Sequence, residues 1–135
     1  AVLGINQLKR LNKNIKQRNF NMNFFLKNID KTKYFTDFDT SGMSNYAFPI
    51  ILKEKSIMVR DQFERYLRKN SIEFRRGNAG GGNQMRQPYL KNLISFKKKN
   101  FTNTEYIHHF GYYIGNYPQF KFKKLNKLIY LLNNF

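Results

Sequence analysis

The side chains that could do chemistry gather in one stretch, from Ile72 to Leu90, which reads IEFRRGNAGGGNQMRQPYL. Four glycines interrupt it, and glycine lets another molecule approach the backbone closely. The amide and guanidinium groups around them suit phosphate or sugar oxygens. This pattern favours a ligand-binding loop, and a flexible surface loop is the alternative interpretation. The candidate ligand-binding residues are Arg75, Arg76, Gly77, Asn83, Gln84, Arg86, Gln87 and Tyr89.

Outside this stretch the sequence offers no reactive set of side chains. It has no cysteine, so there is neither a disulfide framework nor a thiolate metal site. No Ser/His/Asp or Cys/His arrangement is present, and no carboxylates pair at an acid/base spacing. The glycine run also departs from the GxxxxGK(S/T) and GxGxxG patterns that bind phosphates. We therefore interpret the chain as a binding module without a reactive centre of its own.

The two histidines, His108 and His109, are neighbours in a predicted helix and therefore point in different directions. We expect one of them to face the glycine loop and the other to face water, and we include His109 among the substrate-binding residues. A metal site would need further ligands, so we predict none.

Length and composition indicate one folded domain rather than a disordered chain. The 135 residues are 41% hydrophobic, and 14 Phe with 9 Tyr can fill a core. No apolar run is long enough to cross a bilayer, and no signal peptide is present. The opening AVLGINQLKRL lacks a Met and begins directly in a helical pattern. We therefore expect the chain to be a fragment of a longer protein.

The formal charge of +17 raises the question of nucleic-acid binding. The lysines are scattered from Lys9 to Lys127, and the one dense run is Lys97 to Lys99. Most Phe and Tyr fall on apolar stripes, whereas base stacking needs exposed aromatic rings beside arginines. A basic nucleic-acid-binding module therefore stays as an alternative, and the pattern does not favour it.

Hydrophobic periodicity predicts a series of helices and short strands. Residues 1–29 form one long helix whose apolar side chains are Ile5, Leu8, Ile15, Met22, Leu26 and Ile29. Residues 46–52 form a strand, and Pro49 requires a free edge or a bulge there. Ser56 caps the next helix, which Asn70 and Ser71 end. A strand at 72–74 then leads into the glycine loop.

The second half of the chain continues this alternation. We predict a short helical turn at 89–93 and a basic loop at 95–100. A helix capped by Thr102 or Asn103 runs to Gly111, an aromatic strand covers 112–117, and an amphipathic helix covers 122–132. Short strands separated by helices favour an α+β fold with helices on one face of the sheet.

Several stretches, in their order and spacing, resemble the C-terminal part of the DegT-type (DegT/DnrJ/EryC-like) nucleotide-sugar aminotransferases. AVLGINQLKRLNKNIKQRNFN is similar to that family's helix after the catalytic segment, and NYAFPIILK to its first small-domain strand. VRDQFERYLRKNSIEFR is similar to the helix and strand before the substrate loop. The resemblance implies the small C-terminal domain of an aspartate-aminotransferase-fold (fold type I) enzyme, with a short, mostly antiparallel sheet. Residues 1–29 would link to a large domain, and 30–135 would form the small domain with the substrate loop 75–90.

Three further pieces resemble the branch of that family that removes the C3 hydroxyl of nucleotide-linked 4-keto-6-deoxysugars. They are GNAGGGNQMRQPYL, FTNTEYI and YIGNYP. The resemblance implies that Asn78 and Gln87 hold sugar or phosphate oxygens and that Arg86 neutralises an anion. The glycine run is longer than that branch's pattern, so both transamination and 3-dehydration stay open.

The resemblance also implies pyridoxal 5'-phosphate as the cofactor, bound mainly by an upstream domain. The lysine that bonds the cofactor in the aminotransferases, which a histidine replaces in the dehydratase branch, would lie upstream, so Lys53 and Lys55 are not that residue. We expect the fragment alone to be inactive. We expect the full-length protein to be a cytoplasmic homodimer that acts in surface polysaccharide (O-antigen) biosynthesis.

Overall fold

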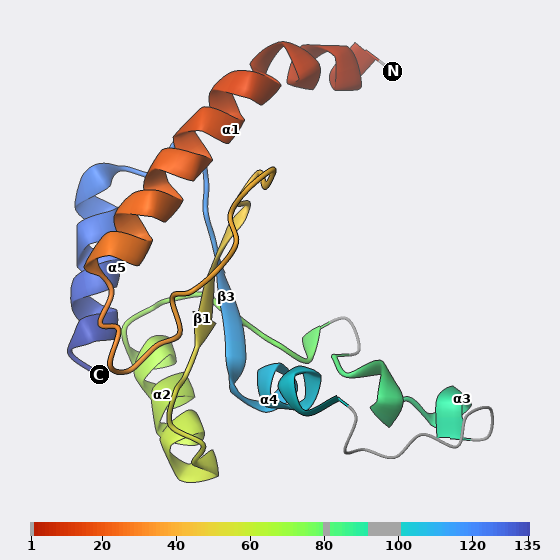
Figure 1. The fold of residues 1–135 in the computed structure, drawn as a ribbon. Helices are drawn as coiled ribbons and strands as arrows, with labels where there is room; N and C mark the ends of the chain where they lie inside the picture. The colour runs from red at the N-terminus through yellow and green to blue at the C-terminus, as the bar shows by residue number, and fades with distance from the viewer. Residues whose placement is uncertain (1, 80–81, 92–100) are drawn as a thin grey trace. The chain divides into compact units, whose positions relative to one another are not determined.

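A computed structural model describes residues 2–79, 82–91 and 101–135 (Figure 1). Its elements are α1 (Val2–Asn28), β1 (Ala47–Ile51), α2 (Ile57–Lys69), β2 (Arg75–Arg76), the 3₁₀ turn η2 (Gln84–Arg86), α3 (Pro88–Lys91), α4 (Thr102–Phe110), β3 (Gly111–Gly115) and α5 (Phe122–Asn133). The chain divides into two compact units, residues 1–48 with 115–135, and residues 49–114. Gly80, Gly81, the basic loop 95–100 with Lys97 to Lys99, and the end of the predicted turn at 92–93 lie outside the described residues.

The first unit packs α1 beside α5 (Figure 1). Both helices bury apolar side chains at intervals of three or four residues, as an amphipathic helix on a core does. The buried residues of the two helices include Met22, Phe25, Leu125, Leu128, Ile129 and Leu132. The ring of Phe25 packs on that of Phe48, with the centroids 4.7 Å apart.

The apolar stripe of α1 is exposed at Ile5 and Leu8 in the first half of the helix, and it is buried at Met22 in the second half. Ile5 is 56% exposed and Leu8 is 67% exposed, whereas Met22 is 2% exposed. Phe122, at the start of α5, is also exposed. Periodicity identifies the apolar face of a helix, but a face is buried only where another element covers it.

A buried asparagine network ties α1 to the chain after β3. The Nδ2 of Asn116 donates to the carbonyl oxygens of Arg18 (2.9 Å) and Asn45 (2.8 Å). The Oδ1 of Asn116 accepts from Asn21 Nδ2 at 3.0 Å. Asn116 is 1% exposed and Asn21 is 2% exposed. Because buried polar groups are costly without partners, this network fixes the path of the chain through the first unit.

The sheet has the strand order β1-β3-β2, so β1 lies at an edge, as Pro49 requires. β2 pairs antiparallel with β3, which places Arg75 opposite Tyr113 and Arg76 opposite Tyr112. The predicted strand at 72–74 is displaced, because the chain is still closing the end of α2 there. Ser71 has a left-handed φ of 54°, and Ile72 N–H donates to the carbonyl of Leu67.

α2 packs an apolar face on β3 in the second unit. The ring of Tyr112 meets those of Phe63 and Phe74 in edge-to-face contacts, with centroids 5.2 and 5.6 Å apart. Tyr112 also donates its hydroxyl to Glu64 Oε1 at 3.2 Å, and burial raises the pKa of the phenol. Glu64 is buried and forms an ion pair with Arg76 (3.2 Å), so the carboxylate is compensated.

The helix caps of the second unit were predicted only in part. Ser56 caps α2 by accepting from Val59 N–H, which confirms that prediction. The cap predicted for α4 is wrong, because Phe101 occupies the position without a side-chain hydrogen bond and Thr102 is already helical. Within the part of the chain that the structure describes, no helix is both long and apolar enough to cross a membrane.

Candidate functional site

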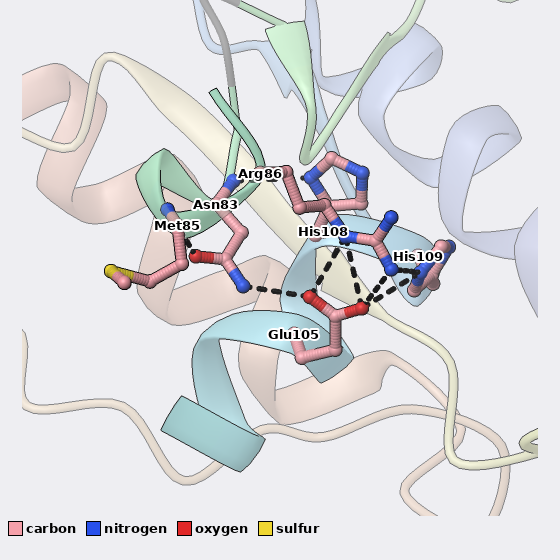
Figure 2. A network of polar contacts seen from close by, with 6 residues as sticks. All are labelled: Asn83, Met85, Arg86, Glu105, His108 and His109. Atoms are coloured by element: carbon pink, nitrogen blue, oxygen red, sulfur yellow. Dashed lines mark hydrogen bonds and ion pairs between the residues drawn. The ribbon is translucent and has the colours of Figure 1, made fainter. Parts of the chain in front are cut away.

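The described part of the predicted substrate loop lies against α4 in the second unit. We refer to residues 75–79 and 82–89 as the glycine segment. α4 presents Glu105, His108 and His109, which are spaced by three and four residues and so share one side of the helix. Figure 2 shows Glu105 at the centre of the polar contacts between this side of α4 and the segment.

Glu105 binds two side chains of the glycine segment. Its Oε2 accepts from Asn83 Nδ2 at 2.7 Å, and Arg86 Nε donates to both carboxylate oxygens at 3.0 Å. Arg86 Nη2 also donates to Glu105 Oε1 and lies 3.0 Å from His109 Nε2 (Figure 2). A guanidinium that meets a carboxylate with two nitrogens forms a directional ion pair, so Glu105 fixes the orientation of Arg86.

The pairing with Arg86 lowers the pKa of the Glu105 carboxyl from 4.5 to about 2, with Asn83 and His109 as smaller causes. A carboxyl with a lowered folded pKa stabilises the fold above its unfolded pKa, and this stabilisation is lost as pH falls toward 2. Because the side chain is 34% exposed, solvent screening reduces the contribution to about 1 kcal/mol.

Replacing Glu105 with Gln is therefore expected to flatten the acid dependence of unfolding between pH 4.5 and pH 2. Urea unfolding at pH 7, 4 and 2.5 measures this, with the exposed Glu73→Gln as the matched control. An E105Q profile that parallels the wild type across this range would contradict the assignment.

His108 binds the backbone of Asn83, whose side chain is bound by Glu105. Asn83 N–H donates to His108 Nδ1 at 3.1 Å, so this nitrogen is an acceptor and the imidazole is neutral. Burial, followed by the nearby His109 and Arg86, lowers the pKa of His108. The expectation that one histidine faces water is therefore wrong, because both rings belong to the network.

Gly82 makes this approach possible. It has a left-handed φ of 61°, and a Cβ at this position would overlap the imidazole of His108 and the backbone of Asn78. The next residue, Asn83, is 5% exposed and accepts from Met85 N–H at 3.0 Å, which starts η2. The glycine signal in the sequence is thus explained at this position by close packing within the chain.

The predicted site residues divide by whether their polar groups are already bound within the chain. Asn83, Arg86 and His109 are bound in the network around Glu105. The side chains of Gln84 and Tyr89 bind each other, and Arg76 forms an ion pair with Glu64. Gly77 N–H donates to the carbonyl of Gly111, and Gln87 N–H to that of Gln84. Arg75 is exposed and Asn78 is half-buried, and neither side chain has a polar partner among the described residues. These two are the groups that remain available to a ligand.

Sequence reasoning missed Glu105 and His108. The available signal was their spacing with His109 on one side of a predicted helix, which places three polar groups together. The described residues contain no group of three side chains that could hold a metal ion.

Two cavities, of about 490 and 400 Å³, lie in the first unit. Their lining residues are Arg10, Asn12, Lys13, Asn14, Lys16, Gln17, Phe20, Pro118 and Gln119. Every lysine whose side chain is described is exposed except Lys33, whose Nζ donates to the carbonyl of Asn133. The contacts between the glycine segment and α4 form an arrangement that can bind and orient a ligand.

The α+β fold, with its small antiparallel sheet, is that of the aminotransferase-fold enzymes that use pyridoxal phosphate. It matches a crystal structure of GDP-4-keto-6-deoxymannose-3-dehydratase with a TM-score of 0.80 and 27% identity, over 96% of this chain and 33% of that one. A sugar aminotransferase of Streptococcus pneumoniae, Spr1654, matches with a TM-score of 0.80 at 13% identity, over 98% of this chain and 33% of that one, which shows the fold alone.

Residues 1–133 match the model of the DegT/DnrJ/EryC1/StrS aminotransferase family, and the chain belongs to this family. It is 31% identical over 122 residues to the lipopolysaccharide biosynthesis protein RfbH of Salmonella typhimurium, covering 87% of this chain and 28% of that protein. It is 29% identical over 135 residues to the GDP-4-keto-6-deoxy-D-mannose 3-dehydratase of Escherichia coli O55:H7, covering 95% and 33%. The chain thus spans about a third of the length of these relatives. The predicted family and fold class are confirmed, and pyridoxal phosphate is the cofactor of the family.

Proposed function

We propose that the chain is the C-terminal part of a pyridoxal phosphate enzyme that acts on a nucleotide-linked 4-keto-6-deoxysugar in surface polysaccharide (O-antigen) biosynthesis. Two relatives of this chain are named for lipopolysaccharide biosynthesis and for a nucleotide-linked keto sugar, which supports the substrate class. In this proposal residues 1–29 link to the large domain, and residues 30–135 form the small domain with the substrate loop 75–90.

The observation that carries the proposal is that most polar groups of the glycine segment are bound within the chain, while two side chains remain available to a ligand. Arg75 offers a guanidinium and Asn78 an amide with no polar partner among the described residues. These groups suit phosphate and sugar oxygens. Asn83, Arg86 and His109 stay in the site as groups that hold the segment on α4. The remaining members of the proposed site are Arg76, Gly77, Gln84, Gln87 and Tyr89.

The chemistry in this proposal is divided between the two parts of the enzyme. Pyridoxal phosphate, bound mainly by the upstream domain, withdraws electrons from the reacting bond, and the protein orients that bond. This chain supplies orientation: Asn78 holds sugar or phosphate oxygens and Arg75 balances charge of the diphosphate, while Arg86, bound by Glu105, holds the segment in place. We further propose a cytoplasmic homodimer for the full-length protein.

Transamination and 3-dehydration are the two reactions that fit this proposal, and the product distinguishes them. An aminotransferase adds an amino group to the sugar, whereas a 3-dehydratase yields a sugar that lacks the C3 oxygen. The coding sequence upstream adds an independent indication, since a lysine at the cofactor position favours the first reaction and a histidine the second. Mass spectrometry of the product identifies the reaction directly.

The test compares the full-length protein with the 135-residue chain. We expect the full-length protein to show pyridoxal phosphate absorbance and to convert a nucleotide-linked 4-keto-6-deoxysugar, and the chain alone to show neither. Covalent binding of the cofactor by the isolated chain would contradict the proposal, as would a full-length protein that binds the cofactor but leaves such sugars unchanged.

A further inference from the structure

Asn83 is bound at four of its polar groups, two of them by α4 and one, its carbonyl oxygen, by Arg86 N–H at 3.0 Å. Its backbone N–H donates to His108 Nδ1 at 3.1 Å, and its side-chain Nδ2 donates to Glu105 Oε2 at 2.7 Å. Its Oδ1 accepts from Met85 N–H at 3.0 Å. With 5% of its surface exposed, Asn83 has little capacity left for a ligand. It connects α4 to the glycine segment instead.

The position of Asn83 bears directly on the available groups of the segment. Gly82, next to it, lies so close to Asn78 that a Cβ at Gly82 would overlap the Asn78 Cα. The backbone at Asn78 is therefore packed against Gly82, the neighbour of the residue that α4 fixes. On the other side of Asn83, Arg86 is bound by the same Glu105 carboxylate.

We propose that Glu105 and His108 are positioning residues, which hold Asn83 on α4 and thereby set the conformation in which Asn78 meets the substrate. This inference rests on the proposed function for the identity of the ligand. In the proposed function the ligand is a nucleoside diphosphate sugar, and the Asn78 amide can bind its sugar or phosphate oxygens.

The contacts of Glu105 and Arg86 could instead serve the global stability of the fold, but their exposure argues against this explanation. Glu105 and Arg86 have side chains that are 34% and 38% exposed, and exposed ion pairs contribute little to stability. Neither residue is in the buried apolar core. Loss of the contacts should therefore release the segment while α2, β3 and α4 keep their packing.

The test uses four variants of the full-length protein: Glu105→Ala, His108→Ala, His108→Asn and the exposed control Glu73→Gln. We expect E105A to raise the KM for the nucleotide sugar about tenfold and H108A about fivefold, with kcat changed less than about twofold. An asparagine Oδ1 can replace the Nδ1 acceptor, so H108N should restore the KM to within about twofold of the wild type. E73Q should behave as the wild type.

A second readout on the same full-length variants does not depend on turnover. Hydrogen exchange should accelerate about tenfold at the Met85 amide in E105A and at the Asn83 amide in H108A, while amides of α2 keep their protection. Unchanged KM values in an active enzyme, equal defects in H108N and H108A, or unchanged exchange at Asn83 and Met85 would each overturn the inference. A wild-type protein that is inactive on nucleotide keto sugars would refute the proposed function, and the exchange data would still report on the hold of α4 over Asn83.

Discussion

Asn116→Asp is expected to lower the free energy of unfolding by about 4 kcal/mol at neutral pH. The Nδ2 of Asn116 donates to the carbonyls of Arg18 and Asn45 at 2.9 and 2.8 Å, and the residue is 1% exposed. Aspartate has almost the same shape but no donor when ionised. It would place a buried negative charge against two carbonyl oxygens that have lost their partners.

Urea unfolding followed by circular dichroism measures this effect, with Asn126→Asp on the exposed side of α5 as the matched control. The buried carboxyl that N116D introduces should have a raised folded pKa, so its protonated form is tolerated better and the deficit should shrink as pH falls toward 4. A deficit equal to that of N126D, or one that grows at acid pH, would show that the asparagine network does not support the first unit.

Some parts of the fold could be predicted because a local pattern in the sequence decides them. The buried face of α5 and the edge position of β1 follow from patterns of apolar side chains and from the missing N–H of Pro49. The cap of α2 follows from Ser56, since a hydroxyl can accept from the free N–H groups of a first turn.

Other elements depended on contacts that a single sequence does not report. β2 is only Arg75–Arg76, and it starts where β3 offers partners rather than where the apolar residues Ile72 and Phe74 occur. The apolar residues in the first half of α1 have the helical period of a buried face, yet Ile5 and Leu8 are exposed. Tertiary contacts decide both outcomes.

In the candidate site, too, the type of a residue can be read from the sequence, whereas its binding partner cannot. Residue type was enough to identify the glycine segment as a polar surface. It was not enough to show that Arg86 is bound to a carboxylate 19 residues away, because the partner is brought close by the packing of α4. The chemistry of a side chain is local, whereas its availability to a ligand depends on the whole fold.

Gly77→Ala is expected to cost about 3 kcal/mol and to displace the glycine segment from α4. A Cβ at this position would overlap the carbonyl group of Ile107, and Gly77 N–H donates to the carbonyl of Gly111 at 2.6 Å. Its φ lies outside the left-handed region, so the cost is steric rather than conformational. Because the overlap is with helix backbone, no rotation of a side chain can relieve it.

Gly4→Ala is the control, and it is expected to raise the free energy of unfolding where Gly77→Ala lowers it. Gly4 lies inside α1 with nothing within 4 Å of an added Cβ, so alanine should stabilise the helix by roughly 0.5–1 kcal/mol. Urea unfolding gives the sign of both effects, and hydrogen exchange at the Asn83 amide reports whether the segment leaves α4 in G77A. Equal stability of G77A and the wild type would mean that the segment accommodates a methyl group against α4. Its glycine would then serve the approach of a ligand rather than the packing that holds Asn83 in place.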